Sequence, residues 1–315
     1  MSCNLGLGTW SLGSDSYGFV SDQEACKILK TAYEEGVRFF DTSPTYGDGL
    51  SEKRIGKFLF KKDDIIIASK VGMLPHSDIK IPFNFSASSM INSIDNSLKR
   101  LNVDSIDLMQ LHSPILGFEE AFSDVFSTIE EVVQSGKVKT FGISLKSPLN
   151  FKPQAKIYEW KSYQYNLSIM DQRIKYQGFK PSDTTNYSKF YIARTPLNFG
   201  FLTDSPPVFD KLTVRNHLKT WSRSQFNEWN RKAVDVKKIL ANYDLDILTA
   251  ALRFPIDSGL ANIVIPGAST VSELIQNVNA FNSLRIQNEL IQELEDFFLK
   301  SERQSIDSPY IYERV

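Results

Sequence analysis

Short strand patterns alternate with helical patterns along this chain, and that alternation limits the fold more than any other feature of the sequence. In the first half, apolar runs predict strands over residues 37–41, 64–70, 106–112 and 138–144. Between them, apolar residues recur at the spacing of an amphipathic helix, around residues 25–33, 51–59, 91–101 and 122–133. Strands that alternate with helices through short connections form a parallel sheet. The first half therefore predicts a series of βα units.

The second half adds three more strand patterns, over residues 162–165, 189–195 and 263–265, and residues 5–8 at the start of the chain supply the eighth. Eight parallel strands are the number that closes a (β/α)8 TIM barrel. An open doubly wound sheet is the alternative, but no Gly-x-Gly-x-x-Gly follows an early strand. Because no Pro-, Gly- or Ser-rich linker divides the chain, we expect one α/β domain over residues 1–315. Long loops are predicted over residues 74–85 and 203–227, at the C-terminal face of the barrel.

The composition excludes several classes of protein. With 36 Lys and Arg against 37 Asp and Glu, the net charge is −1, which argues against a nucleic-acid binder. No apolar run is long enough to span a membrane, and no basic segment precedes an apolar stretch at the N-terminus as in a signal peptide. Cys3 and Cys26 form neither a disulfide framework nor a metal-ligand pattern. We therefore expect a cytoplasmic globular protein without a metal.

Polar residues stand at the C-terminal ends of the predicted strands, where the active sites of barrel enzymes lie. Asp41, Lys70 and His112 end three successive strands. One such residue alone is more often a solvated turn residue, and His112 alone could be a hydrogen-bonded structural histidine. Three such residues at the ends of successive strands are harder to explain by structural roles alone. The same position in later strands is held by Ser144, Gln164 and Arg194.

A carboxylate, an ammonium and an imidazole, together with a phenol, can deliver a proton to a carbonyl oxygen. The candidate phenol is Tyr46, in the loop just after Asp41. A free tyrosine is too weak an acid to work well at neutral pH, and an ammonium beside it favours the phenolate form. The chain shows neither a nucleophile elbow nor a metal-binding motif. Together these observations predict reduction of a carbonyl, with the hydride supplied by a cofactor.

In these and neighbouring residues the chain resembles a known family, the aldo-keto reductases. Asp41-Thr-Ser-Pro-Thr-Tyr-Gly47 is similar to the signature loop of that family. Seven further segments resemble family motifs in the same order: Gly8-Thr9-Trp10, Ser69-Lys70-Val71, Leu111-His112-Ser113, Gly142-Ile143-Ser144, Gln164-Tyr165-Asn166, Thr195-Pro196-Leu197 with Gly200 and Leu202, and Ile265-Pro266-Gly267-Ala268. The similarity extends from about residue 5 to residue 285.

The resemblance implies a (β/α)8 barrel that binds an extended nicotinamide dinucleotide. It also implies the catalytic roles: Tyr46 donates the proton, Lys70 makes the phenol more acidic, Asp41 pairs with Lys70, and His112 orients the carbonyl. Two alternatives stay open. A cofactor-binding sensor or regulatory barrel would have no need of all four groups, and a sugar isomerase or lyase would use Lys70 as a Schiff base.

The resemblance further implies a cofactor site. Its residues are Gly8, Thr9, Trp10, Ser144, Gln164, Arg194, Leu197, Gly200, Leu202, Gly267, Ala268, Ser269, Gln276 and Asn277. The chain departs from the family pattern at Leu145, where an asparagine is common. It departs again at Arg194, where an aromatic residue often stacks on the nicotinamide. Arg194 could stack on that ring, bind an anionic group of the substrate, or form a salt bridge within the barrel.

A third departure concerns the choice of cofactor. Residues 266–277 contain no Lys or Arg, and Glu273 lies where an arginine often binds the 2′-phosphate of NADPH. The family default still places NADPH slightly ahead of NADH, with Arg215, Lys219 or Arg223 as the source of the missing charge. We expect the substrate to be an aldehyde, a ketone or a sugar-like carbonyl, and Arg194 favours a polar sugar derivative. A monomer is the default oligomeric state.

Overall fold

The computed structural model describes residues 4–13, 18–59, 62–74, 83–179 and 189–304. Its centre is one eight-stranded parallel sheet in the order β1 to β8. The strands are β1 Gly6–Gly8, β2 Phe39–Asp41, β3 Ile66–Val71, β4 Ile106–His112, β5 Val138–Ser144, β6 Ser162–Asn166, β7 Phe190–Arg194 and β8 Ile263–Ile265. Bridges from Leu5 to Val264 and from Gly8 to Gly267 join β8 to β1. The sheet therefore closes on itself, and the predicted (β/α)8 barrel is confirmed.

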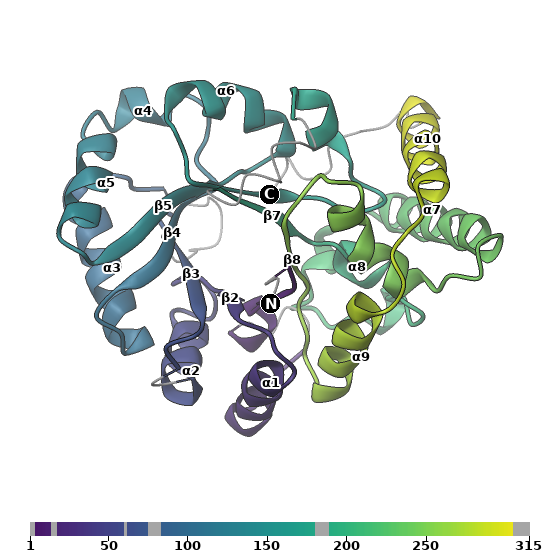
Figure 1. Ribbon diagram of the computed structural model, residues 1–315, viewed down its shortest axis with the longest axis horizontal. Coiled ribbons are helices and arrows are strands. Elements are labelled where there is room, and N and C mark those ends of the chain that lie inside the picture. The colour runs from purple at the N-terminus through teal and green to yellow at the C-terminus, as the bar shows by residue number, and fades with distance from the viewer. Residues whose placement is uncertain (1–3, 14–17, 60–61, 75–82, 180–188, 305–315) are drawn as a thin grey trace.

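Helices surround the barrel on its outside (Figure 1). They are α1 Asp22–Glu34, α2 Leu50–Phe58, α3 Ala87–Leu101, α4 Phe118–Ala121, α5 Val125–Gln134, α6 Phe151–Ile157, α7 Arg223–Ala241, α8 Ile247–Asp257, α9 Val271–Asn282 and α10 Asn288–Gln304. Short 3-10 helices include η1 Trp10–Leu12, η2 Pro148–Asn150, η3 Arg173–Gln177, η5 Asn198–Gly200, η6 Phe209–Lys211 and η7 His217–Thr220. Most connections between neighbouring strands run through these helices, as parallel pairing requires.

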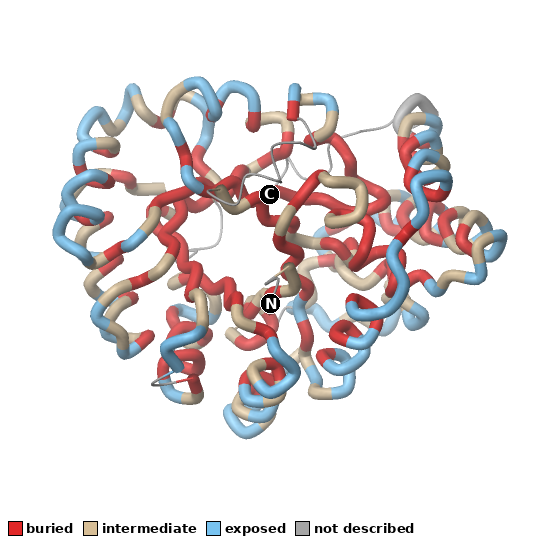
Figure 2. The backbone as a smooth tube through the Cα atoms, viewed as in Figure 1, coloured by how far each residue is buried: buried red, intermediate tan, exposed pale blue. Residues whose placement is uncertain are grey.

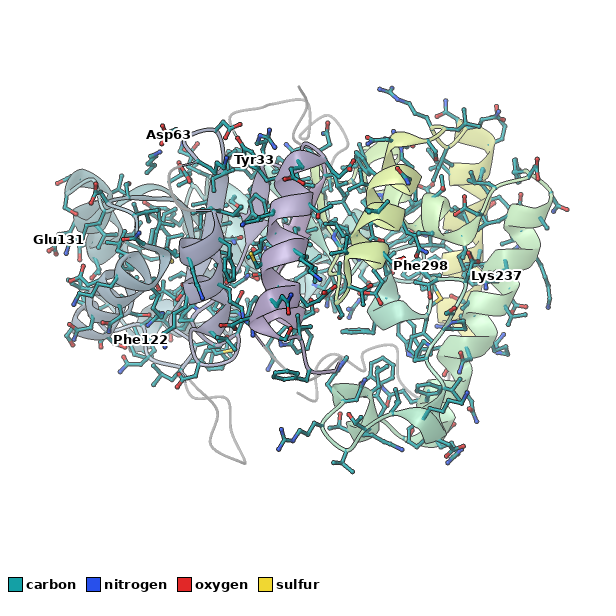
Figure 3. The ribbon with its side chains drawn as sticks, turned by 90° about the horizontal axis from the view of Figure 1, so that it is seen from below. Tyr33, Asp63, Phe122, Glu131, Lys237 and Phe298 are labelled. Carbon is teal, nitrogen blue, oxygen red and sulfur yellow. The ribbon has the colours of Figure 1, made fainter. Side chains whose placement is uncertain are left out.

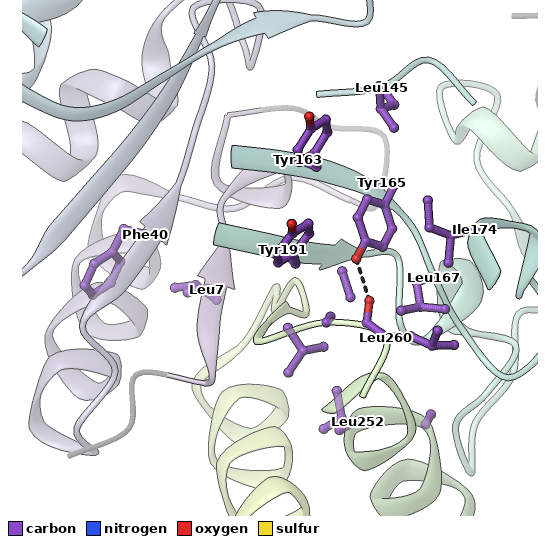
Figure 4. Close-up of a cluster of buried hydrophobic side chains, with 14 of the residues drawn as sticks. Leu7, Phe40, Leu145, Tyr163, Tyr165, Leu167, Ile174, Tyr191, Leu252 and Leu260 are labelled. Atoms are coloured by element: carbon purple, nitrogen blue, oxygen red, sulfur yellow. Dashed lines mark hydrogen bonds between the residues drawn. The ribbon is translucent and has the colours of Figure 1, made fainter. Parts of the chain in front are cut away.

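Both faces of the strands are buried, which explains their nearly continuous apolar sequence. Figure 2 shows the strands in red, enclosed by helices whose outer sides are exposed. Inside the barrel, Phe39, Ala68, Leu108 and Ile192 form one cluster. On the outer side of β6 and β7, Tyr163, Tyr165 and Tyr191 pack under the helices (Figure 4), and the Tyr165 hydroxyl donates to the carbonyl of Leu260 at 2.5 Å.

The alternation of side chains along the strands places the polar residues at the mouth of the barrel. Side chains two residues apart on a strand share a face. Asp41 comes two residues after the interior residue Phe39, and Lys70 comes two residues after Ala68. Both polar side chains therefore stand one layer above the apolar interior, at the C-terminal ends of their strands.

Two predicted elements differ clearly from the structure. The helix predicted around residues 122–133 begins only at Val125, because Phe122 has left the helical conformation (φ −132°, ψ 70°) and ends the separate short helix α4. The predicted loop over residues 203–227 ends earlier, because Ser222 caps α7 by accepting a hydrogen bond from the Gln225 N–H. That loop carries η6 and η7, and Figure 3 shows this pale green segment projecting from one end of the barrel. Residues 75–82 of the other predicted loop lie outside the described residues.

Candidate active site

A cavity of about 1060 Å³ opens at the C-terminal ends of the strands and extends to α9. Its size is at the upper end for small-molecule sites, which suits an extended dinucleotide together with a substrate. Of the predicted site residues, those on its wall are Gly8, Thr9, Trp10, Asp41, Tyr46, Gln164, Arg194, Leu197, Gly200, Gly267, Ala268, Ser269, Gln276 and Asn277. Ser144, Leu202, Lys70 and His112 are not among the lining residues; Lys70 is fully buried, whereas His112 keeps 9% of its surface exposed.

Lys70 is the buried centre of the site. Its Nζ atom lies 2.5 Å from Oδ1 of Asp41 and 3.1 Å from the phenol oxygen of Tyr46, and it also donates to the carbonyl of Thr42 at 2.9 Å. Burial alone would lower the pKa of Lys70, but the negative charge of Asp41 and the oxygen of Tyr46 raise it above its usual value. The lysine is therefore an ammonium ion that touches the phenol on the cavity wall.

The second oxygen of Asp41 is held from the other side of the barrel. Gln164 Nε2 donates to Oδ2 of Asp41 at 2.6 Å, and Gln110 Nε2 lies 3.5 Å from the same atom. Gln164 in turn accepts a hydrogen bond of 3.1 Å from the hydroxyl of Ser144. Ser144 and Gln164, two of the predicted cofactor residues, thus also orient the carboxylate that binds Lys70.

His112 stands beside the phenol. Its ring meets the ring of Tyr46 edge-on, with the centroids 6.4 Å apart and an angle of 83° between the planes. Its Nδ1 atom lies 3.3 Å from the hydroxyl of Ser43, in the same loop as Tyr46. The structure thus brings together Asp41, Tyr46, Lys70 and His112, the four residues that the sequence picks out.

Aromatic side chains around His217 form another wall of the cavity. The ring of His217 lies 5.5 Å from Trp10, 4.7 Å from Phe199 and 6.1 Å from Trp221. Burial lowers the pKa of His217 to about 4, so this imidazole is neutral at physiological pH. Phe199 reaches it from a turn with left-handed backbone (φ 59°). His217 ends no predicted strand, and only the aromatic residues of its loop could have marked it.

The far end of the cavity lies at the start of α9. Thr270 caps this helix by accepting from the Glu273 N–H, and the carboxylate of Glu273 accepts from the Ser269 N–H at 2.7 Å. Asn277 Nδ2 donates to the carbonyl of Gly267 at 3.2 Å. This end presents backbone groups, amides and one carboxylate, a donor and acceptor set that fits an adenosine.

The cavity's cations are not on α9 or on the turn before it. Among the described lining residues they are Lys146 and Arg194, and Arg194 Nη2 donates to the carbonyl of Leu145 at 2.8 Å. The basic residues of the predicted loop 203–227 do not line the cavity: Arg223 pairs with Asp210 at 2.5 Å, and the Lys219 ammonium lies over the ring of Phe209. The structure therefore does not support that loop as the source of a charge for a 2′-phosphate.

Leu202 is the predicted cofactor residue that the structure places furthest from that role. Its side chain is fully buried, and its N–H donates to the carbonyl of Leu197. The tight turn at Asn198–Gly200 directs Leu202 into the core, and the residues that follow, Thr203 to Ser205, line the cavity instead.

Within the ranges that the structure describes, no three His, Cys, Asp or Glu side chains form a group that could hold a metal ion. In the same ranges, no helix combines the length and the apolar character needed to cross a membrane.

Known proteins share both the sequence pattern and the fold. A sequence model of the Aldo/keto reductase family matches residues 4–298. D-threo-aldose 1-dehydrogenase from Pseudomonas sp is 29% identical over 297 residues, covering 87% of each chain. L-galactose dehydrogenase from Arabidopsis thaliana is 29% identical over 309 residues, covering 92% of this chain and 89% of the relative.

Solved structures show the same fold. An aldo-keto reductase from Bacillus halodurans in its holo form superposes with a TM-score of 0.76 at 24% identity, covering 93% of this chain and 91% of the other. A glycerol dehydrogenase from Gluconobacter oxydans also gives a TM-score of 0.76, at 21% identity, covering 97% and 93%. The chain therefore belongs to the aldo/keto reductase family and is an NAD(P)H-dependent oxidoreductase.

Proposed function

We propose that this enzyme reduces the carbonyl group of an aldehyde, a ketone or a sugar to the alcohol, and catalyses the reverse oxidation, with Tyr46 as the proton donor. The contact of 3.1 Å between the Lys70 ammonium and the Tyr46 phenol oxygen, at the cavity wall, carries this proposal. A nicotinamide cofactor supplies the hydride that adds to the carbonyl carbon. The chain supplies the proton that the carbonyl oxygen then needs.

The proton step follows from the geometry. As negative charge develops on the substrate oxygen, Tyr46 transfers its proton to that oxygen, and the resulting phenolate is stabilised by the Lys70 ammonium. Asp41 keeps Lys70 charged and in place through the contact of 2.5 Å. His112, edge-on to Tyr46, stands where it can orient the carbonyl oxygen. When the alcohol is oxidised, the same groups act in reverse, and Tyr46 accepts the proton from the alcohol hydroxyl.

For the cofactor, we propose that the adenosine lies against Gly267, Ser269 and Asn277 at the start of α9, and the nicotinamide lies near Tyr46 and Gln164. We further propose NADH as the preferred form, against the family default of NADPH. A 2′-phosphate needs a cation, and the described lining residues near α9 include the carboxylate of Glu273 but no Lys or Arg. A carboxylate there repels a phosphate and can accept from a ribose hydroxyl.

For the substrate, the names of two relatives, an aldose dehydrogenase and a galactose dehydrogenase, support a sugar or sugar-like carbonyl. Trp10, Met73 and Phe83 give the cavity apolar walls near Tyr46, and an antiparallel bridge joins Met73 to Phe83. Such walls can pack against the carbon skeleton of a sugar while polar groups contact its hydroxyls.

The two alternative functions have less support. A Schiff-base mechanism needs a neutral lysine, whereas the contacts of Lys70 raise its pKa and keep it an ammonium ion. A purely regulatory barrel would not require a buried ion pair aimed at a phenol on the cavity wall.

The direct experiment is titration of the purified protein with NADH and, separately, with NADPH, followed by nicotinamide fluorescence. Binding of either cofactor and turnover of a sugar aldehyde support the proposal. Binding without turnover of any aldehyde, ketone or sugar would favour the regulatory barrel, and turnover without added cofactor would favour the lyase.

A further inference from the structure

Lys146 is a cation in the cavity that the proposed reaction leaves without a task. It comes two residues after Ser144, the last residue of β5, and its half-buried side chain lines the cavity. Within the described ranges, its ammonium takes part in no hydrogen bond or ion pair. A partly buried charge loses hydration, and a partner of opposite charge offsets that cost. The position therefore suits an anion that arrives with a ligand.

The carboxylates of the cavity wall do not supply that anion. Among the described lining residues, Asp41 pairs with Lys70, Asp204 lies 3.9 Å from Lys237, Asp246 accepts from the Thr249 N–H, and Glu273 accepts from the Ser269 N–H. A second cation of the cavity wall, Arg194, contacts the backbone next to Lys146 instead. Arg194 Nη2 donates to the carbonyl of Leu145, the residue directly before Lys146. The Arg194 side chain, from the end of β7, is thus held against the backbone one residue before Lys146, and both cations line the cavity.

This positive wall is on the side of the cavity that carries the reacting groups. In the β4–β5 pairing, His112 lies opposite Ser144, and the Ser113 N–H donates to the Ser144 carbonyl at 2.8 Å. Ser113 also lines the cavity, in a left-handed turn with φ 52°. The proposed adenosine site at α9 is at the other end of the same cavity. An anion beside Lys146 would therefore belong to the substrate.

We propose that Lys146, with Arg194 beside it, recognises an anionic group of the substrate, so that the preferred substrate is a sugar or other carbonyl compound bearing a carboxylate or a phosphate. This inference rests on the proposed reduction of a carbonyl at Tyr46. It narrows the substrate class beyond the neutral sugars named for the two relatives. Hydrogen bonds between charged groups are about twice as strong as neutral ones, so the anion should be selected over a neutral analogue.

The test compares three sugars that differ only at carbon 6: D-glucose, D-glucuronate and D-glucose 6-phosphate. Each is titrated by calorimetry into full-length Tyr46→Phe protein saturated with reduced cofactor, because this substitution slows the reduction whose heat would otherwise add to that of binding. We expect at least one of the two anions to bind about ten- to hundredfold more tightly than glucose, and whichever anion does so identifies carboxylate or phosphate as the natural group. In Lys146→Gln this preference should be lost, in Lys146→Arg it should be kept, and in Lys53→Gln, an exposed lysine on α2, it should be unchanged.

Two results would overturn the inference. One is equal binding of all three sugars, or no binding of any, by cofactor-bound protein that keeps Lys146. The other is a Lys146→Gln variant that keeps the preference for the anion, or that weakens only cofactor binding, which would assign the lysine to the cofactor. Failure of the wild-type protein to bind NADH or NADPH in the fluorescence titration would instead count against the proposed function. The two proposals therefore fail in distinguishable ways.

Discussion

Gln164 donates a hydrogen bond of 2.6 Å from Nε2 to Oδ2 of Asp41, joining β6 to β2 across the mouth of the barrel. The two side chains are almost completely buried. Oδ1 of Asp41 contacts Lys70, so Gln164 satisfies the oxygen that the lysine does not reach. Gln164 therefore acts as a positioning residue for the carboxylate, in addition to any contact that it makes with the cofactor.

Replacing Gln164 by leucine should destabilise the protein and slow catalysis. The substitution leaves Oδ2 of Asp41 with only the distant amide of Gln110, at 3.5 Å. An unsatisfied buried acceptor costs about 1–3 kcal/mol, which urea denaturation would detect as a lower free energy of unfolding. The control is Gln134→Leu at an exposed position of α5, which should change that free energy by less than about 0.5 kcal/mol. Equal effects of the two variants would show that Gln164 does not support Asp41.

The buried ion pair predicts a non-additive effect on stability. Lys70→Met or Asp41→Asn alone leaves one partner uncompensated in the interior and should lower the free energy of unfolding by about 3–5 kcal/mol. The double variant removes both charges, so it should lose less than the sum of the single variants while staying inactive. Denaturation curves for the four proteins measure this coupling. Additive losses would mean that the pair does not act as a unit.

The carboxylate at α9 should discriminate against NADPH. Glu273→Gln keeps an oxygen that can accept from the Ser269 N–H but removes the negative charge. We expect wild-type protein to bind NADH more tightly than NADPH, and this variant to bind NADPH about three- to fivefold more tightly than wild type does, with little change for NADH. Fluorescence titration gives both dissociation constants. Glu131→Gln, on the exposed side of α5, is the control, and a wild-type preference for NADPH would refute the assignment.

His217 should make the protein less stable in acid. Its pKa is about 4 in the folded protein and about 6.5 in an unfolded chain. Between these values the unfolded state binds more protons, so the free energy of unfolding falls as the pH falls from about 6.5 to 4, by up to about 3 kcal/mol. In His217→Gln this part of the pH dependence should disappear. Urea denaturation at several pH values tests it, and parallel pH profiles would contradict it.

The sequence predicts the barrel well because buried parallel strands have an unmistakable pattern. The residues of β4, β5 and β8 agree with the predicted strands at both ends, since each strand begins with a β-branched apolar residue and ends in a polar residue or a Pro-Gly turn. The candidate catalytic residues are found for a related reason. The C-terminal ends of the parallel strands all meet at the mouth of the barrel, so a polar residue that ends a strand lies there. Their roles, the single domain, the monomeric state and the cytoplasmic location stay predictions.

The residues that the sequence does not predict depend on contacts between distant segments. His217 and Phe199 meet only because a left-handed turn directs Phe199 toward η7. Leu202 resembles a cavity residue in sequence but is turned into the core, and periodicity says nothing about that turn. Lys146 has no distinguishing neighbours in sequence and is recognised only by the cavity that it lines.

The central claim is that Tyr46 protonates a carbonyl oxygen whose carbon receives a hydride. It is tested most directly by single-turnover reduction of a sugar aldehyde with cofactor deuterated at both C4 positions of the nicotinamide. We predict one deuterium at the former carbonyl carbon of each product molecule. Transfer should be slower by about 10²–10⁴ in Tyr46→Phe and unchanged in Tyr33→Phe, whose hydroxyl bonds Asp64 on the outside of the barrel (Figure 3). Product without deuterium, or transfer at the wild-type rate in Tyr46→Phe, would contradict the account.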